Sequence, residues 1–448
     1  MTTDMTTDQH LEQLFEFLRI PTISALSQHD HDMKRACLWL KEAFEKIGFD
    51  SDILPTAGHP LVYAESMAAG EDKTTLLIYG HYDVQSPDPL EQWTSKPFEP
   101  EVRGNNIYCR GVADDKAQLY AWIAAVGEWV KSGKTLPVNI KFLIEGEEEV
   151  GGHNLETFIG QNQSLLKADI CLISDSHCLS EDQPVIDYGL RGIVYAELDV
   201  RTFARDVHSG IYGGNVLNPI QVLAEMLAKL KNDDHLISIP GFYDHVRQLS
   251  DLEQQELDAS PLSTEQVIAE TGAKMVTGEK GYSVAARAGA RPSLDVHGIW
   301  GGYQDDGAKT IIPAEAHAKV SMRIVPHQTS AEIAELFEKY IKRLTPEGVD
   351  VQVRFLSNGE PILMDRHTHF FKKAELAYQK AFGKTPIYEL SGGSIPVTAM
   401  FKTLLNLDCI LMGFGLPDDG LHSPNEKMSI AMFEKGITTC KEFIATFE

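Results

Sequence analysis

Three apolar runs, each ending in acidic or histidine residues, constrain the fold of this chain most. The runs occupy residues 74–79, 138–144 and 168–174. Directly after them stand His81 and Asp83, the acidic run 145–149, and Asp175. Nearly continuous apolar runs are typical of strands buried on both faces of a parallel sheet. Because open α/β sheets bind ligands at the carboxyl ends of their strands, we expect these polar side chains to lie together.

A helix is predicted between the first two runs, and two aspartates stand at its entrance. Apolar residues recur at helical spacing across residues 119–130. Asp114 and Asp115 precede them, where the free N–H groups of a helix start favour negative charge. A capping role explains one aspartate but not the other acid and histidine clusters. The sequence therefore predicts an α/β fold with a mostly parallel central sheet, flanking helices and Asp114 at the point of convergence.

The middle of the chain has a different pattern. Strict apolar alternation at 316–324 and 349–355 predicts half-buried strands, and helices are expected at 219–230 and from 330. Two helices on one antiparallel sheet make an inserted α+β domain, predicted at residues 191–357. Residues 1–190 and 358–448 then form one discontinuous domain. Residues 232–290 give no clear assignment.

Charge and composition limit the partners. The formal net charge is −25, from 65 acidic residues against 40 lysines and arginines. Such a surface repels phosphate backbones and anionic lipid, which argues against nucleic acid and membrane partners. The polar residues 1–9 lack the pattern of a signal peptide, and no apolar run is long enough to span a bilayer. We expect a cytoplasmic protein.

The polar clusters contain what a pair of divalent metal ions requires. Such a pair needs a bridging carboxylate, further His and carboxylate ligands, and open positions for water and substrate. His81 and Asp83 lie two residues apart and project on one face, which suits a ligand and the acid that orients it. The run 147–149 is either a solvated acidic turn or the source of a metal ligand and a general base.

The order of motifs resembles a known family. The motifs are His81-Tyr82-Asp83, Gly111-Val112-Ala113-Asp114-Asp115-Lys116, Glu145-Gly146-Glu147-Glu148-Glu149-Val150-Gly151, Ser174-Asp175, Asp206-Val207-His208-Ser209-Gly210 and His422-Ser423-Pro424-Asn425-Glu426. Together they resemble the dinuclear metallopeptidases of the M20 clan, over nearly the whole chain. The branch of carnosinase and the cytosolic nonspecific dipeptidases is the most similar. The resemblance implies a zinc-exopeptidase-like fold.

The resemblance assigns roles at the predicted metal site. Asp114 becomes the bridge between two ions, and its peptide bond to Asp115 is cis in the family. The other ligands are His81 and Asp175 at one ion, and Glu149 and His422 at the other. Glu148 matches the general base, and Asp83 matches the supporting acid. Zinc is the expected metal, with manganese or cobalt as alternatives.

The resemblance also implies that the inserted domain is a lid that forms a homodimer. His208 matches a histidine that reaches the active site of the partner subunit and stabilises the oxyanion; by itself, it would be read as a turn residue. Thr310, Arg323 and Ser394 match contacts to a substrate carboxylate. An arginine suits the free carboxylate of a dipeptide, although a strand salt bridge also explains Arg323.

The predicted function is metal-dependent hydrolysis of dipeptides by a metal-bridging water that Glu148 activates. An N-acyl amino acid deacylase, or a related amidohydrolase of the same clan, is the alternative with the same metals and base. A non-catalytic dimeric scaffold is the alternative from another class. The presence of every ligand and of the base argues against the scaffold.

Overall fold

A computed structural model describes residues 5–393 and 395–448 and separates the chain into two compact units. Unit 1 runs up to Tyr188 and includes Met364–Tyr388 and the chain from Pro396 onward. Unit 2 comprises Gly189–Leu363 and Glu389–Ile395. Residues 389–395 were expected with the terminal part of the chain. Residues 389–393 and Ile395 group with unit 2, where Nε of Arg191 donates to the carbonyl oxygen of Gly392 at 3.1 Å.

The larger sheet has nine strands among the described residues, in the order β1-β2-β6-β3-β7-β17-β8-β15, with β16 beside β8. Its strands are β1 (Asp50–Leu54), β2 (Leu61–Ser66), β3 (Thr75–His81), β6 (Asn139–Glu145), β7 (Ile170–Ile173), β8 (Val185–Leu190), β15 (Ile362–Leu363), β16 (Ile387–Ser391) and β17 (Cys409–Leu411). The central strands β6-β3-β7-β17 are parallel, and antiparallel pairs flank them. The predicted sheet is confirmed.

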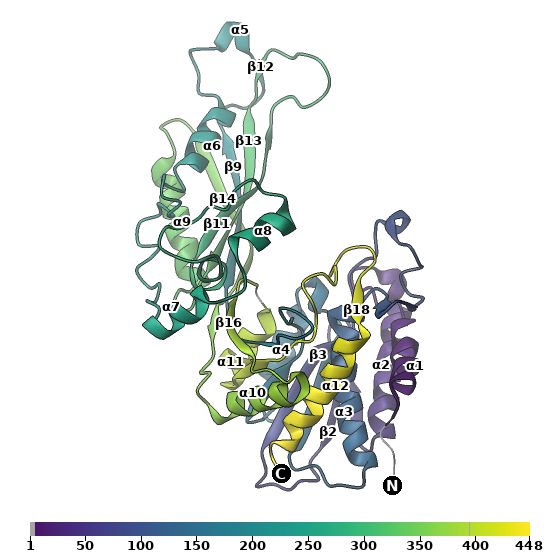
Figure 1. Cartoon of the computed structure of the whole chain (residues 1–448). Coiled ribbons are helices and arrows are strands. Elements are labelled where there is room, and N and C mark those ends of the chain that lie inside the picture. The colour runs from purple at the N-terminus through teal and green to yellow at the C-terminus, as the bar shows by residue number, and fades with distance from the viewer. Residues whose placement is uncertain (1–4, 394) are drawn as a thin grey trace. The chain divides into compact units, whose positions relative to one another are not determined.

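Helices cover both faces of this sheet (Figure 1). They are α1 (Thr7–Leu18), α2 (Asp30–Lys46), α3 (Ala117–Lys131), α4 (His153–Gln161), α10 (His369–Phe382), α11 (Pro396–Leu405) and α12 (Ile430–Ala445). Along β3, Gly80 faces Leu119 of α3, whereas Tyr79 meets Phe401 of α11 at 5.7 Å between ring centroids. Because neighbouring strand residues point to opposite faces, α3 and α11 lie on opposite sides of the sheet.

The strands that lead to the predicted site are buried along their length. Every residue of β6 and β7 is buried, as is all of β3 after Thr75. This burial explains their continuous apolar sequence. A smaller sheet, β18-β5-β4, lies in the same unit and consists of β4 (Glu101–Arg103), β5 (Asn106–Tyr108) and β18 (Lys427–Ser429). It brings the chain after Tyr108 next to the chain before Lys427.

Unit 2 contains an antiparallel sheet with strands in the order β11-β13-β9-β14. The strands are β9 (Gly192–Arg201), β11 (Ser293–Gly301), β13 (Glu315–Ile324) and β14 (Asp350–Gly359). Helices α6 (Pro219–Ala228) and α9 (Ser330–Leu344) pack on this sheet over one apolar core. The prediction of two helices on an antiparallel sheet is confirmed.

Unit 2 also contains several shorter elements. They are β10 (Val207–His208), β12 (Ile311–Ile312), α5 (Ser209–Tyr212), α7 (Asp251–Asp258) and α8 (Thr264–Thr271). The last two helices lie in the stretch that the sequence left unassigned. Strands β10 and β12 pair with each other beyond the end of β13, at the tip of unit 2 that carries α5 (Figure 1). Within the described ranges of both units, no helix is long and apolar enough to cross a membrane.

Candidate metal centre and active site

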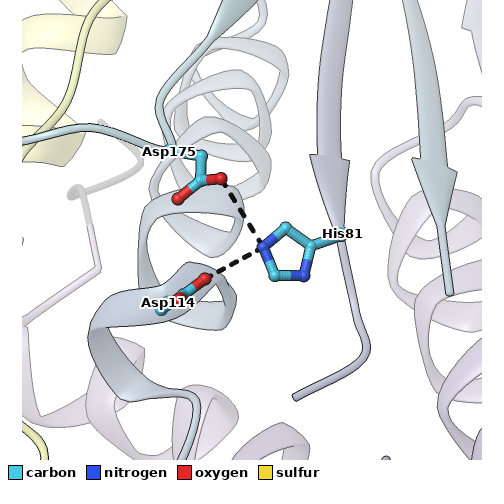
Figure 2. A group of neighbouring side chains, drawn as sticks. All are labelled: His81, Asp114 and Asp175. Atoms are coloured by element: carbon cyan, nitrogen blue, oxygen red, sulfur yellow. Dashed lines mark ion pairs between the residues drawn. The ribbon is translucent and has the colours of Figure 1, made fainter. Parts of the chain in front are cut away.

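His81, Asp114 and Asp175 converge at the carboxyl edge of the larger sheet (Figure 2). His81 ends β3, and Asp175 follows the neighbouring parallel strand β7. Nε2 of His81 lies 3.0 Å from Oδ1 of Asp114 and 3.7 Å from Oδ2 of Asp175. One nitrogen and two carboxylate groups therefore face a common point.

A second group forms on the other side of Asp114. Nε2 of His422 lies 3.0 Å from Oδ2 of Asp114 and 3.2 Å from Oε2 of Glu149. Glu149 belongs to the short turn η4 (Glu148–Val150), which follows β6. His422 lies in the loop between β17 and β18, with a left-handed backbone at φ 59°. Since the two oxygens of Asp114 face different groups, this aspartate is shared between them.

The backbone around Asp114 is held close to β3. Asp114 lies in the short turn η3 (Val112–Lys116), directly before α3, and its peptide bond to Asp115 is cis. Oδ2 of Asp115 accepts a hydrogen bond from the backbone N–H of His81 at 3.2 Å. A Cβ atom on Gly80 would lie 2.9 Å from that same oxygen. Glycine at position 80 therefore allows the start of α3 to approach the end of β3.

Asp83 connects His81, a candidate metal ligand, to the acidic turn. Its backbone oxygen lies 3.1 Å from Nδ1 of His81, and its Oδ1 lies 3.4 Å from the same nitrogen. The carboxylate also accepts the backbone N–H groups of Glu148 at 3.3 Å and Glu149 at 3.1 Å. Orientation of a ligand histidine through its second ring nitrogen is the usual arrangement in metal sites. Asp83 thus holds the imidazole and the turn in one geometry.

Opposite charges in the two groups shift one another's pKa values. Burial alone would raise the pKa of Asp114, but the imidazoles of His422 and His81 outweigh burial and hold it well below its usual value. Burial alone would lower the pKa of His81, but Asp114 and Asp83 raise it well above its usual value. The carboxylates of Asp114 and Glu149 raise the pKa of His422 to about 10.

The remaining acids at this edge are less well compensated. Burial raises the pKa of Asp175 well above its usual value, and the charges of Asp114 and Asp115 raise it further. Burial also raises the pKa of Glu148 to about 7, and the charge of Glu149 adds to the effect. Several carboxylates are therefore crowded at this edge, with His81 and His422 beside them. Bound cations would relieve this repulsion.

The donor atoms fit a pair of divalent metal ions. Within each group, the candidate ligand atoms lie within 4.8 Å of one another. Ligand atoms that are about 2.1 Å from one ion lie about 3–4 Å apart in tetrahedral geometry. Nε2 of His81 is buried and has no hydrogen-bond partner among the described residues, although two carboxylates face it. Such a nitrogen is suitably placed to bind a cation between itself and those oxygens.

Three of the four predicted substrate contacts belong to unit 2. His208 is exposed in β10, and its Nδ1 accepts the backbone N–H of Gly210 at 3.0 Å. Thr310 lies beside it, since its carbonyl oxygen accepts the N–H of Ser209 at 3.0 Å. Arg323 is partly buried in β13, and burial lowers the pKa of its guanidinium group. Ser394 lies outside the residues that the structure describes.

His208 and Thr310 lie at the opposite end of unit 2 from Arg323. The β10–β12 pair adjoins the end of β13 where Glu315 begins the strand. Arg323 lies near the other end, eight residues further along, which corresponds to about 26 Å at about 3.3 Å per residue. The structure therefore brings His208 and Thr310 together but separates Arg323 from both within one chain.

Sequence reasoning missed one polar contact to the second ligand group. Nε2 of Gln85 donates to Oε2 of Glu149 at 2.9 Å and to its carbonyl oxygen at 3.3 Å. Gln85 follows Asp83 by two residues in the segment after β3, and this spacing was the available signal. The contact orients one carboxylate oxygen of Glu149.

An α/β sheet with two ligand groups sharing one aspartate at its carboxyl edge is typical of hydrolases that use two metal ions. Comparison with known proteins makes the class specific. Residues 77–446 match the family model described as Peptidase family M20/M25/M40. The chain belongs to this family, as its motifs predict.

Named relatives span most of the chain. The Cys-Gly metallodipeptidase DUG1 of Candida albicans is 30% identical over 96% of this chain and 92% of its own length. The human Beta-Ala-His dipeptidase is 30% identical over 83% of this chain and 74% of its own. A solved M20 family metallo-carboxypeptidase from Sulfolobus solfataricus superposes with a TM-score of 0.87 at 32% identity, covering 98% of this chain and 99% of the other.

Proposed function

We propose that the protein is a metal-dependent dipeptidase that binds two divalent ions through Asp114. The observation that carries the proposal is the placement of the two oxygens of Asp114, which face two separate ligand groups. Relatives named as dipeptidases support the choice of substrate. Bound divalent ions polarise a peptide carbonyl and lower the pKa of water. The first ion is assigned to His81 and Asp175, and the second to Glu149 and His422.

Glu148 is the proposed general base. The neighbouring residue Glu149 belongs to one ligand group. The charges of His81 and Asp114 both affect the pKa of the Glu148 carboxyl group. In this role Glu148 takes the proton of the attacking water and passes it to the leaving amine. Asp83 supports the base by accepting its backbone N–H.

The proposed substrate contacts come from two subunits. Arg323 would bind the free carboxylate of a dipeptide with its planar guanidinium group, and Ser394 is proposed as a second contact to that carboxylate. His208 and Thr310 lie at the opposite end of unit 2, so we assign them to the active site of a partner subunit. There His208 would stabilise the oxyanion of the tetrahedral intermediate. This assignment implies a homodimer that forms through unit 2. Unit 2 would also act as the lid of the active site.

Exposed apolar side chains next to His208 favour this assignment. The exposed fraction is 66% for Ile211 and 47% for Tyr212, both in α5. Leu217 follows with 45% exposed. Apolar side chains gathered at the tip of a unit are typical of a surface that meets another protein. Because His208 and Arg323 of one chain lie far apart, a second copy of this chain is the proposed partner.

Mixing two inactive variants tests this arrangement. His208→Ala and Arg323→Ala would each inactivate the homodimer. In a mixed dimer, one active site would combine an intact Arg323 with an intact partner His208, so random exchange should restore about a quarter of wild-type activity. A mixture that stays inactive after verified subunit exchange would contradict the two-subunit site.

Zinc is the proposed metal, because its affinity for mixed imidazole and carboxylate ligands is high. Manganese and cobalt ions suit the same donors, and availability in the cell would decide between them. The cytoplasm is the proposed compartment. Metal analysis of protein purified without added metal would identify the natural ion.

The substrate class is tested with three compounds of matched side chains. Purified protein is loaded with zinc, manganese or cobalt and given a dipeptide, a tripeptide and an N-acetyl amino acid. We expect cleavage of the dipeptide and its loss when a chelator is added. Preferred cleavage of the N-acetyl compound would establish the deacylase alternative. Equal cleavage of the tripeptide would contradict the restriction to dipeptides, and inactivity with every metal would overturn the proposal.

A further inference from the structure

Glu426 is a buried acid close to the candidate metal centre, yet it belongs to neither ligand group. Its carboxylate accepts four hydrogen bonds. Oε2 accepts the backbone N–H of Gly111 at 2.8 Å and Nη1 of Arg110 at 2.6 Å. Oε1 accepts the backbone N–H groups of Ala113 at 2.9 Å and Asp114 at 3.2 Å. The carboxylate therefore caps the start of η3, the turn that carries the shared aspartate.

Strand pairing puts Glu426 in this place. Lys427 pairs with Tyr108 where β18 meets β5, and the backbone N–H of Cys109 donates to the carbonyl oxygen of Glu426 at 3.1 Å. The chain then continues from Cys109 through Arg110 and Gly111 into η3. On the other side, Glu426 follows His422 by four residues. Glu426 thus lies where two segments of the chain run side by side. One segment supplies Asp114 to the second ligand group, and the other supplies His422.

Arg110 extends the connection to the His422 loop. It is 1% exposed, and its Nη2 donates to the carbonyl oxygens of Ser423 at 3.2 Å and Ser86 at 3.4 Å. Ser423 is the residue after His422. A guanidinium group with several donors in a fixed plane can hold a carboxylate and two carbonyl groups at the same time. The Arg110–Glu426 pair therefore connects the backbone of Asp114 to the backbone next to His422.

We propose that Glu426 is a positioning residue that sets the geometry of the shared Asp114 and of the His422 loop. The inference rests on the proposed function and deepens it. Glu426 binds backbone N–H groups on one side of η3, while the side chain of Asp114 points to both ligand groups. Fixing the backbone fixes where the carboxylate oxygens of Asp114 can lie. Contacts behind the ligands of a metal site commonly determine its affinity.

Glu426→Gln is the informative variant because it keeps the size of the side chain. In either orientation of the amide, an NH₂ group replaces one carboxylate oxygen and faces two donors. Two of the four hydrogen bonds are lost, and Arg110 loses its compensating charge. Since Asp114 is shared, we expect both ions to bind more weakly, by about 10- to 100-fold.

Glu279→Gln is the matched control. Glu279 accepts Nε of Arg291 at 2.9 Å and Nη2 at 2.6 Å, with side-chain exposures of 12% for the acid and 8% for the arginine. The control removes the charge from an arginine pair in unit 2 that is largely buried, although less so than the Arg110–Glu426 pair, among residues that belong to neither ligand group. It separates a general loss of stability from a specific loss of metal binding.

Full-length zinc-loaded proteins are dialysed against increasing chelator, and the retained zinc is measured by elemental analysis. We expect Glu426→Gln to lose both ions at a chelator concentration about 10- to 100-fold lower than wild type and Glu279→Gln require. The visible spectrum of the cobalt-loaded variant should also change, since it reports coordination geometry. Retention equal to that of the control, with an unchanged spectrum, would overturn the inference.

A second variant covers a failure of Glu426→Gln to fold. Glu426→Asp keeps the charge next to Arg110 but is one methylene shorter, so it cannot reach all four donors at once. We expect weakened retention of both ions, and wild-type retention would again refute the positioning role. Wild-type protein that never holds two ions would instead overturn the proposed function. The two failures are therefore distinguishable.

Discussion

Replacing Glu148 with glutamine removes a proton acceptor while keeping the size of the side chain. The backbone N–H of Glu148 donates to Oδ1 of Asp83 at 3.3 Å, and this contact survives the substitution. Neither ligand group includes Glu148. Burial already disfavours the charged form of this carboxyl group and raises its pKa to about 7, so a neutral amide is not costly there. The substitution should change proton transfer and little else.

The size of the effect follows from this role. A positioned general base accelerates its reaction by about 10²- to 10⁴-fold, or about 3–5 kcal/mol of transition-state stabilisation. We therefore expect kcat for dipeptide hydrolysis by Glu148→Gln to fall by that factor, with KM nearly unchanged. The metal content should remain at two ions per chain, and Tm should stay within a few degrees of wild type.

The assay measures amine release from a dipeptide by zinc-loaded protein, together with metal content and Tm. Glu147→Gln is the matched control, because Glu147 is the preceding acid in sequence but accepts Nδ2 of Asn154 at 2.8 Å. The control should keep kcat within about twofold of wild type. Wild-type kcat in Glu148→Gln with both ions bound would refute the assignment of the base.

Three further perturbations have defined outcomes. Asp114→Asn should reduce metal content at both positions, whereas loss of one ion only, seen by elemental analysis, would contradict sharing. Arg323→Lys should raise KM for dipeptides by about tenfold with little change in kcat, because the two-pronged guanidinium group is replaced by a point charge. An unchanged KM would contradict the binding of the substrate carboxylate by Arg323. Glu253→Gln tests the pair with Arg247, which lowers the pKa of Glu253 to about 2. Since this pKa lies below the usual 4.5, the pair stabilises the fold above pH 4.5 and loses its effect as pH falls towards 2. The variant should be less stable by about 0.5 kcal/mol at pH 7. Measured by calorimetry, the difference in free energy of unfolding between wild type and Glu253→Gln should narrow as the pH falls from 7 to 3. A difference that stays constant or widens would refute the stabilising role of the pair.

The central strands were predictable because burial on both faces leaves a simple pattern. Strands β3, β6 and β7 lie inside the sheet, and their apolar sequence reflects that environment directly. Strand β11 was not predicted, because a β-bulge between Val296 and Gly298 interrupts the alternation of its apolar residues. Helix α7 was also missed, although Ser250 and Glu253 form a capping box at its start. That signal was present and unused.

In the candidate site, too, some features were predictable from the local sequence and others were not. Each metal-ligand candidate stands in a motif or at the end of an apolar run, so its type and position could be found without coordinates. Contacts between segments that are distant in the sequence could not be found in this way. Nothing local indicates that Glu426 caps the turn that begins more than 300 residues earlier, or that Gln85 binds Glu149. Such contacts depend on the pairing of β18 with β5 and on the path of the loop after β3.

Anomalous X-ray diffraction from crystals of the zinc-loaded protein tests the shared aspartate most directly. Data collected on both sides of the zinc absorption edge locate the ions without reference to activity. We expect two peaks in each active site, one beside His81 and Asp175 and one beside Glu149 and His422, with one oxygen of Asp114 directed at each. A single peak, or two peaks with Asp114 bound to only one of them, would contradict the account.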